Sequence, residues 1–184
     1  MKKVYLLLAE GFETIEALAP VDILRRGGVE VVTLSIHDSI QVKSAQNIIV
    51  HSDGLLSDYD LSDGDMLVLP GGAPGYTNLG RSAEVIKFSK KYLEDDKFLA
   101  AICGAPTILE SAGLLKNRKI TCHYGVRDNI KDGILAEKTE KIVQDEKLIT
   151  ASGAGIGIDF GLKLVEVLVG PEKVSELLKS LTVI

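Results

Sequence analysis

Cys103 is the residue whose setting most clearly favours chemistry. It follows an apolar run typical of a buried strand, residues 98–102, and opens residues 104–112, which have the pattern of a helix. A side chain on such a turn projects above the sheet, and its neighbours must be small, as Gly104 and Ala105 are. The helix start would stabilise a thiolate. Most free cysteines are buried and inert, but this pattern predicts a reactive one.

Two further side chains, Glu16 and His123, are candidates for moving protons near that thiol. Glu16 lies among apolar residues early in a predicted helix, residues 13–26, and a buried carboxyl group there would need a proton or a partner. From the residues alone, a solvent-exposed glutamate is the commoner interpretation. His123 ends a predicted strand, residues 119–123, where it could act as a general acid or base. Alternation along that strand would direct Cys122 into the core.

Glycine-rich turns follow two of the predicted strands. Gly71 and Gly72 come after residues 66–69 and could direct N–H groups into a site, as an oxyanion hole requires. Residues 153–157 resemble a dinucleotide fingerprint, but the third glycine is misplaced, so a tight turn is predicted. The sequence has no P-loop and no His, Cys or carboxylate set at ligand spacing. We therefore expect no metal and no cofactor.

The elements that must position these residues follow from short apolar runs alternating with amphipathic stretches. The predicted strands are residues 4–9, 29–34, 40–42, 48–50, 66–69, 98–102, 119–123, 141–144 and 147–151, of which 40–42 and 48–50 could form a hairpin. The predicted helices are residues 13–26, 82–93, 104–112, 157–168 and 172–181. This order predicts βαβ units and a mostly parallel sheet covered on both faces. Function in such sheets lies at the carboxyl ends of the strands.

Length and composition are those of an ordinary globular protein. A chain of 184 residues predicts a single domain, residues 1–184, and 46% hydrophobic with 26% charged residues excludes a coiled coil or a disordered tail. The net charge of −5 argues against nucleic-acid binding. The apolar runs are too short for a membrane span or a signal peptide. With only two cysteines, we expect a cytoplasmic protein with reduced thiols.

Four segments, taken in order, resemble the ThiJ/PfpI superfamily and most closely its Parkinsonism-associated deglycase branch. They are residues 9–16 (AEGFETIE), 20–28 (PVDILRRGG), 69–72 (LPGG) and 101–106 (AICGAP). The resemblance runs from Lys3 to about Val169. It implies a flavodoxin-like three-layer α/β sandwich related to class I glutamine amidotransferase domains.

The resemblance also implies roles for individual residues. Cys103 would be the nucleophile, and a protonated Glu16 would bond to its thiolate, with His123 nearby. The backbone at Gly72 and Gly104 would line an anion pocket.

Two positions depart from the pattern of the family. The PfpI peptidase branch carries a histidine directly after the nucleophile, where this chain has Gly104, which argues against a peptidase. The deglycase branch has an Arg-Gly-Pro-Gly turn near the last strand, where this chain has Ser-Gly-Ala-Gly from Ser152. An anion-binding cation is therefore absent from that turn.

These observations lead to one principal hypothesis, a cofactor-free, cysteine-dependent hydrolase or lyase acting on α-oxoaldehydes or their early glycation adducts. Cys103 would add to the aldehyde, and Glu16 and His123 would move protons before hydrolysis to a hydroxy acid. The alternatives are a redox-sensing stress protein or chaperone with an oxidisable Cys103, an intracellular cysteine peptidase, and a binding protein with a vestigial site.

The expected partners are a small aldehyde or glycated substrate and a second copy of the chain. The first helix carries more apolar surface than one sheet face should cover, and the edge pieces 40–42 and 48–50 need protection from open pairing. The family resemblance also implies a homodimer through these segments. We expect no membrane and no nucleic-acid partner.

Overall fold

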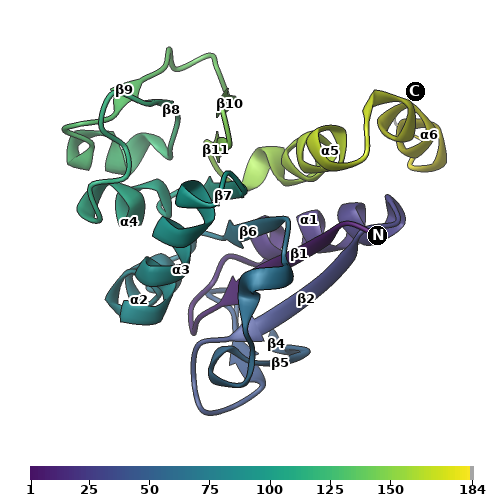
Figure 1. Ribbon diagram of the computed structural model, residues 1–184, viewed down its shortest axis with the longest axis horizontal. Helices are drawn as coiled ribbons and strands as arrows, with labels where there is room; N and C mark the ends of the chain where they lie inside the picture. Colours follow the sequence, from purple (N-terminus) through teal and green to yellow (C-terminus); the bar gives the residue numbers. More distant parts are fainter. Residues whose placement is uncertain (183–184) are drawn as a thin grey trace.

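A mostly parallel sheet runs through the centre of the computed structural model, which describes residues 1–182 (Figure 1). The last two residues of the predicted domain lie outside the described residues. The strands are β1 (Lys3–Leu8), β2 (Glu30–Ser35), β3 (Gln41–Lys43), β4 (Ile49–His51), β5 (Gly54–Leu55), β6 (Met66–Leu69), β7 (Phe98–Ile102), β8 (Lys119–Ile120), β9 (Ile134–Leu135), β10 (Ile142–Asp145) and β11 (Leu148–Ala151). The seven-stranded sheet has the order β10-β11-β7-β6-β1-β2-β5, and only β10 and β11 are antiparallel neighbours.

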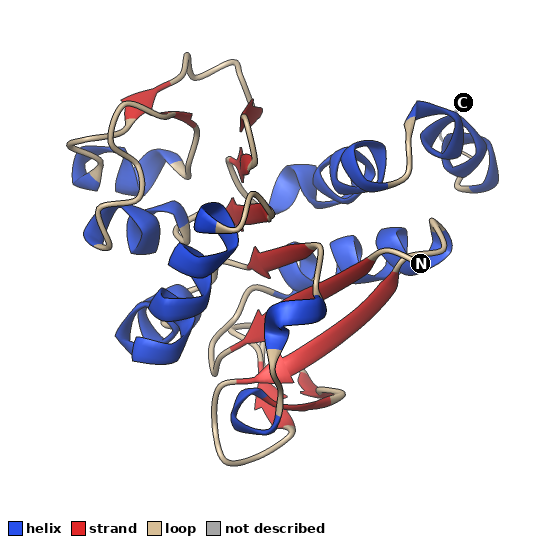
Figure 2. Cartoon of the chain, viewed as in Figure 1, coloured by secondary structure: helices blue, strands red, loops and turns tan. Residues whose placement is uncertain are grey.

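Helices cover both faces of this sheet (Figure 2). They are α1 (Thr14–Arg26), α2 (Gly75–Arg81), α3 (Ala83–Glu94), α4 (Pro106–Ser111), α5 (Gly157–Leu168) and α6 (Pro171–Ser180). The hydrophobic side chains of α1, α5 and α6 pack on one face, and those of α2, α3 and α4 pack on the other. The three-layer, flavodoxin-like architecture is therefore confirmed.

Alternation along β1 divides the core into its two halves. Val4, Leu6 and Leu8 point to the α1–α5 side, whereas Tyr5 and Leu7 point to the opposite side. All five are at most 1% exposed, and burying a side chain of this size contributes about 1.5–3 kcal/mol. A strand buried on both faces reads as the continuous apolar run seen in the sequence.

Helices α1 and α5 approach closely because the contact is made by a glycine. A Cβ added at Gly161 would lie 2.9 Å from the Cβ of Ile23, and it would also meet the backbone of Pro20. This contact fixes the position of α1, which carries Glu16, relative to the turn that precedes α5.

The predicted strand at residues 119–123 is wrong beyond its first two residues. β8 pairs with β9 in a separate two-stranded sheet and does not join the central sheet. The backbone N–H groups beyond β8 bond to other acceptors and not to a neighbouring strand. The Thr121 N–H donates to the Thr150 hydroxyl (2.9 Å), and the His123 N–H donates to the Cys103 carbonyl (2.9 Å). His123 therefore begins a 3₁₀ turn, Tyr124–Asn129, and does not end a strand of the sheet.

Other differences are smaller. The helix predicted at residues 104–112 is limited to α4, and α2 was not predicted, because its seven residues are too few and too glycine-rich to show a helical period. The hairpin at residues 40–42 and 48–50 is confirmed as the antiparallel pair β3–β4. The turn predicted at 153–157 is confirmed as a 3₁₀ turn, Ala154–Ile156, leading into α5.

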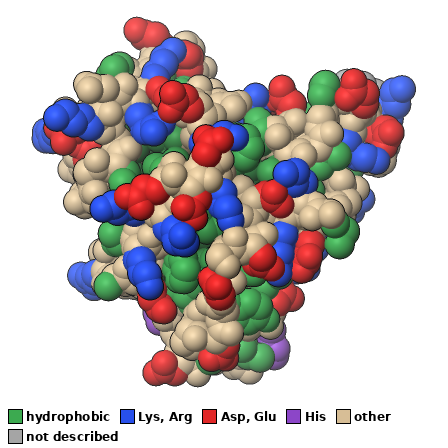
Figure 3. All heavy atoms as spheres, in the orientation of Figure 1, with side chains coloured by type: hydrophobic (Ala, Val, Ile, Leu, Met, Phe, Trp, Pro, Cys, Tyr) green, Lys and Arg blue, Asp and Glu red, His purple; other side chains and the backbone are tan. Residues whose placement is uncertain are grey.

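The surface carries no large field of one sign on the face shown in Figure 3, where Lys and Arg side chains are mixed with Asp and Glu. Within residues 1–182, no helix is both long and apolar enough to cross a membrane.

Candidate active site

The predicted site residues meet at the carboxyl ends of the central strands. Within the sheet, β2 pairs with one edge of β1, whereas β6 and then β7 lie beyond its other edge. A crevice forms where the strand order reverses in this way. The loops that follow β6 and β7 open there and carry Gly71 with Gly72 and Cys103, and the loop after β1 leads into α1, whose first turn carries Glu16.

Cys103 occupies a sharp turn directly after β7. Its φ is +65°, a left-handed conformation that a residue with a side chain rarely adopts. The turn is held on two sides, because the Cys103 N–H donates to the Ala151 carbonyl (2.9 Å) and the Cys103 carbonyl accepts from the His123 N–H (2.9 Å). These bonds fix the thiol between the end of β11 and the segment that carries His123.

Glu16 is buried, with 1% of its surface exposed, so the surface interpretation is wrong for this residue. The Glu13 carboxylate caps α1 by accepting from the Glu16 N–H (2.8 Å), which places Glu16 in the first helical turn facing inward. There its carboxyl group accepts from the Gly71 N–H (3.0 Å) and is hydrogen-bonded with the Cys103 thiol and the Ala154 backbone. The residues next to Glu16 in the sequence do not indicate this burial, because its partners Gly71, Cys103 and Ala154 come from distant segments.

The two glycines after β6 have different tasks. A Cβ at Gly71 would clash with the Glu16 carboxyl group and would lie 2.6 Å from the Cβ of Cys103, so only glycine allows this approach. Because its N–H is already bonded to Glu16, Gly71 is not available as an oxyanion donor. Gly72 has φ +91°, and its N–H and that of Gly104 face the Cys103 sulfur.

Burial and mutual repulsion raise the proton affinity of the Glu16–Cys103 pair. Burial raises the pKa of Glu16 to about 7, although the hydrogen bond with Cys103 lowers it. Burial and then the Glu16 charge raise the pKa of the Cys103 thiol to about 12, against the lowering effect of the Gly72 and Gly104 N–H groups. Two anions in contact repel strongly, so the pair keeps one proton between these two steps. The position at a helix start therefore does not lower the pKa of Cys103 by itself, because burial and the Glu16 charge outweigh it.

His123 lies beside this pair, and one of its ring nitrogens accepts a hydrogen bond from the backbone. Its Nδ1 accepts from the Gly125 N–H (3.1 Å), so Nε2 carries the proton of the neutral ring. The ring of Tyr124 lies against it, with centroids 4.2 Å apart. The Nε2–H of His123 therefore remains free to donate to a substrate oxygen.

Cys103 and His123 line a common cavity of about 230 Å³. Its wall includes Gly72, Gly104 and Tyr76. A Cβ at Gly104 would lie 2.6 Å from the Tyr76 ring, so the histidine of the peptidase pattern has no room at this position.

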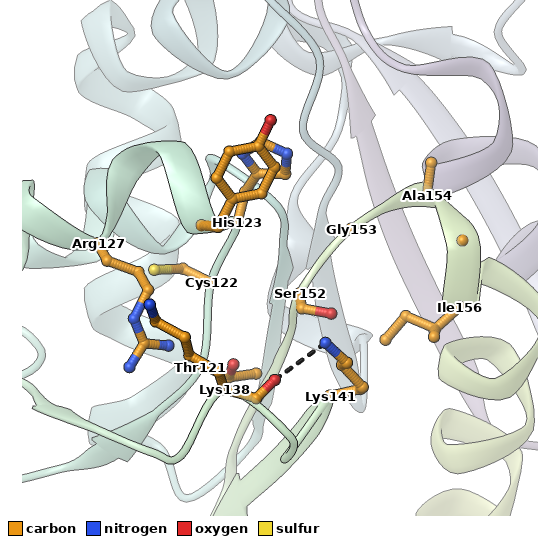
Figure 4. A pocket seen from close by; sticks show the side chains of 12 residues that line it. Thr121, Cys122, His123, Arg127, Lys138, Lys141, Ser152, Gly153, Ala154 and Ile156 are labelled. Atoms are coloured by element: carbon orange, nitrogen blue, oxygen red, sulfur yellow. Dashed lines mark hydrogen bonds between the residues drawn. The ribbon is translucent and has the colours of Figure 1, made fainter.

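A second and larger cavity, of about 580 Å³, lies on the other side of His123 (Figure 4). It contains neither Cys103 nor Glu16. Its lining includes Arg127, Lys138 and Lys141, which sequence reasoning missed because they are scattered along the chain. Ser152, the departure from the deglycase pattern, also lines it, and its N–H donates to the Lys141 carbonyl (2.9 Å).

Cys122 is 2% exposed and packs in the core, as predicted, although residues 121–123 form no strand and the side chain also borders the larger cavity. Burial raises the pKa of its thiol to about 11. Both cysteines are free thiols. Among residues 1–182, no three His, Cys, Asp or Glu side chains gather as a metal site would require.

Comparison with known proteins places this architecture in a family. A model of the DJ-1/PfpI family matches residues 2–167. The chain is 34% identical over 176 residues to the glutathione-independent glyoxalase DJR-1.2 of Caenorhabditis elegans, covering 96% of this chain and 93% of that protein. It is 36% identical to DJ-1 homolog B of Arabidopsis thaliana, which covers 95% of this chain, but this chain spans only 40% of that longer protein.

A solved structure, Toxoplasma gondii DJ-1 in an oxidized form, superimposes with a TM-score of 0.94 at 31% identity. The match covers 99% of this chain and 98% of that one.

The two cysteines should differ in reactivity towards an alkylating agent. Cys103 is half-buried beside a cavity, whereas Cys122 is almost wholly buried, so limiting iodoacetamide should label Cys103 first. Peptide mapping of the native protein by mass spectrometry checks this, with denatured protein as the control in which both thiols react. Equal labelling of the native protein, or a preference for Cys122, would contradict the assignment.

The Glu16–Cys103 pair should make stability fall as pH rises through the acidic range. The folded protein keeps a proton up to about pH 7 that an unfolded glutamate, with its pKa of 4.5, has already lost. Because the native state then binds more protons, unfolding free energy decreases with pH, by about 3 kcal/mol over this window.

Chemical denaturation between pH 4 and pH 8 checks this, with Glu16→Gln as the variant that has no titratable group at position 16. The stability of the wild type minus that of Glu16→Gln should decrease across the window, which cancels the opposite trend of the surface carboxylates. A difference that stays flat with pH would show that Glu16 titrates normally.

Proposed function

We propose that this chain, which belongs to the DJ-1/PfpI family, is a cofactor-free, cysteine-dependent enzyme acting on α-oxoaldehydes or their early glycation adducts. The observation that carries the proposal is the buried hydrogen bond between the Glu16 carboxyl group and the Cys103 thiol. A relative of nearly the same length that is named a glutathione-independent glyoxalase supports this class of reaction.

In the active form, Glu16 holds the proton that the pair shares. Its O–H then donates to the Cys103 sulfur, and the Gly72 and Gly104 N–H groups add two further donors. The thiolate is the nucleophilic form of cysteine. The protein thus stores a nucleophile and an acid in contact, which is the combination that addition to a carbonyl group requires.

The reaction with an α-oxoaldehyde such as methylglyoxal follows from these positions. The Cys103 sulfur bonds to the aldehyde carbon, and the aldehyde oxygen takes the Glu16 proton, which gives a hemithioacetal. The Glu16 carboxylate, which has just given up its proton, takes the proton from that carbon, while the His123 Nε2–H donates to the neighbouring carbonyl oxygen as the enediolate forms. The proton is then returned to the neighbouring carbon and the hydroxyl proton passes to its oxygen, so the hemithioacetal becomes a thioester. Water cleaves the thioester, which releases the 2-hydroxy acid and frees Cys103. No electron acceptor is needed, because one carbon is oxidised as its neighbour is reduced.

Redox sensing is the second candidate function. Cys103 is half-buried and faces backbone donors that would also hold the oxygens of a sulfenic or sulfinic acid. The close structural match to an oxidized Toxoplasma gondii DJ-1 supports this candidate. Free thiols at Cys103 and Cys122 fit the reducing cytoplasm that we propose as the location of the protein.

We further propose that the chain acts as a single-domain homodimer. On α1, Val21, Ile23 and Leu24 are covered within the chain, but Ile15 is 50% exposed. Other exposed isoleucines lie close to it. Ile158 follows Gly157, whose Cβ position would contact Ile15, and Ile48 and Ile49 are on the β3–β4 hairpin, which Gln46 bonds to Thr14. Such an apolar patch is typical of an interface.

The purified protein should convert methylglyoxal to lactate without added metal, nucleotide or thiol. Cys103→Ala should abolish this, because no other thiol lines the smaller cavity, whereas His123→Ala should lose less, since general acid–base catalysis contributes about 10²–10⁴-fold. Cys122→Ala is the matched control and should stay active. Enantiomer-resolved lactate assays measure the product. Equal slow aldehyde loss in wild type and Cys103→Ala would mean that methylglyoxal only modifies lysines and arginines.

Sedimentation equilibrium at micromolar concentration should give twice the 19.8 kDa chain mass. Ile49→Asp, at a position 59% exposed on the hairpin, should shift the protein towards the monomer because it places a charge in the proposed interface. Ile134→Asp, at a position 55% exposed on β9, is the matched control and should leave the mass unchanged. A wild type that sediments only as the 19.8 kDa species would rule out the dimer.

A further inference from the structure

The larger cavity is separate from the cavity that holds the thiol, but the two adjoin. His123 lines both of them, so it is the wall between the spaces of about 230 Å³ and about 580 Å³. The larger space lies between residues 121–127 on one side and residues 152–156 on the other (Figure 4). Its size is within the range of about 300–1,000 Å³ that is usual for small-molecule sites.

The charge of this cavity has one sign. Arg127, Lys138 and Lys141 line it, and no Asp or Glu does. In the view of Figure 4 the three side chains enter the cavity from two sides. None of the three forms an ion pair within the described part of the chain, although nearby Arg118 and Lys119 do so with Asp145, Glu146 and Glu140.

Backbone contacts hold two of these cations in place without neutralising them. The Arg127 guanidinium donates to the Ala136 carbonyl (2.7 Å), and the Lys141 ammonium donates to the Lys138 carbonyl (2.9 Å). The Ser152 hydroxyl, on the opposite side, adds a neutral donor. Fixed like charges around one space repel each other, and an anion placed among them relieves that repulsion.

The different volumes of the two cavities suit different parts of a substrate. An α-oxoaldehyde as small as methylglyoxal needs only the smaller cavity next to Cys103. The larger cavity is then left for whatever amine or thiol the aldehyde has modified, on the far side of His123.

We infer that the cavity formed by Arg127, Lys138 and Lys141 is a subsite for the anionic half of the substrate, so that the chain prefers glycation adducts of small amines or thiols bearing carboxylate or phosphate groups. This inference rests on the proposed function, since it names the substrate class of that same site. Carboxylate and phosphate share the chemistry that the three cations recognise.

The test measures binding of three lactoyl amides that mimic the adduct after isomerisation. N-lactoyl-aspartate carries two carboxylates, N-lactoyl-phosphoethanolamine carries a phosphate, and N-lactoyl-ethanolamine is the neutral control. Calorimetric titration into the full-length Cys103→Ala protein avoids turnover. At least one anionic ligand should bind about tenfold or more tightly than the neutral ligand. The identity of the tighter ligand shows whether the subsite prefers carboxylate or phosphate.

Removing the cations should remove this preference. With Lys138→Gln and Lys141→Gln introduced together, the anionic ligand should weaken by on the order of fivefold per lost charge, with the neutral ligand unchanged. Lys116→Gln, which removes an exposed lysine outside the cavity, is the matched control and should have no effect. Equal affinity for anionic and neutral ligands, or a preference that survives the double substitution, overturns the subsite.

Lactate formation from free methylglyoxal separates this inference from the proposed function. If wild-type protein forms lactate but binds all three amides equally well, the proposed function stands and the anionic subsite is refuted. If the protein forms no lactate but binds the anionic amides more tightly, the proposed function is refuted and the anion site stands.

Discussion

The contact between the Glu16 carboxyl group and the Cys103 thiol is the interaction on which the rest of this site depends. Two acidic groups in a buried space cannot both be ionised, so the pair must keep one proton over a wide pH range. The surrounding backbone is shaped to that need. Glu13 caps α1 so that Glu16 faces inward, Gly71 has no side chain so that the carboxyl group reaches the sulfur, and the left-handed turn at Cys103 presents the thiol. The fold supplies these parts from three separate segments at the crevice of the sheet.

His123 links this pair to the second half of the site. Its backbone bonds to Cys103, its Nδ1 is occupied by Gly125, and its ring faces both cavities. The two cavities differ in electrostatics: one is built around an acid–thiol pair, and the other around three cations. A substrate with a carbonyl carbon at one end and negative charge at the other would match both, and an isolated aldehyde would use only the first.

The sequence predicted the layers well because burial of the central strands is a local pattern. Residues 4–8 read as apolar because helices cover both faces of β1, and the small residues around Cys103 reflect its sharp turn. Prediction failed where partners come from afar. Nothing near Glu16 shows that Gly71, Cys103 and Ala154 will enclose it, so only the family resemblance pointed to its role. Residues 121–123 look like strand, but bonds to Thr150 and Cys103 draw them out of the sheet. Lys138 and Lys141 carry no motif, and only the turn between β9 and β10 brings them to Arg127.

The central claim is that Glu16 holds the shared proton and Cys103 is the thiolate, and the ultraviolet absorbance of the thiolate tests it most directly. The measurement is a pH titration of wild-type absorbance minus that of Cys103→Ala, repeated in the Glu16→Gln background. We predict a Cys103-dependent thiolate signal that is already present at neutral pH in the wild type, because a protonated Glu16 and the Gly72 and Gly104 N–H groups donate to the sulfur. It should remain in Glu16→Gln, because the amide N–H can still donate to the sulfur. A wild type with no thiolate signal until strongly alkaline pH would show that Glu16 ionises first, and the account of the nucleophile would be wrong.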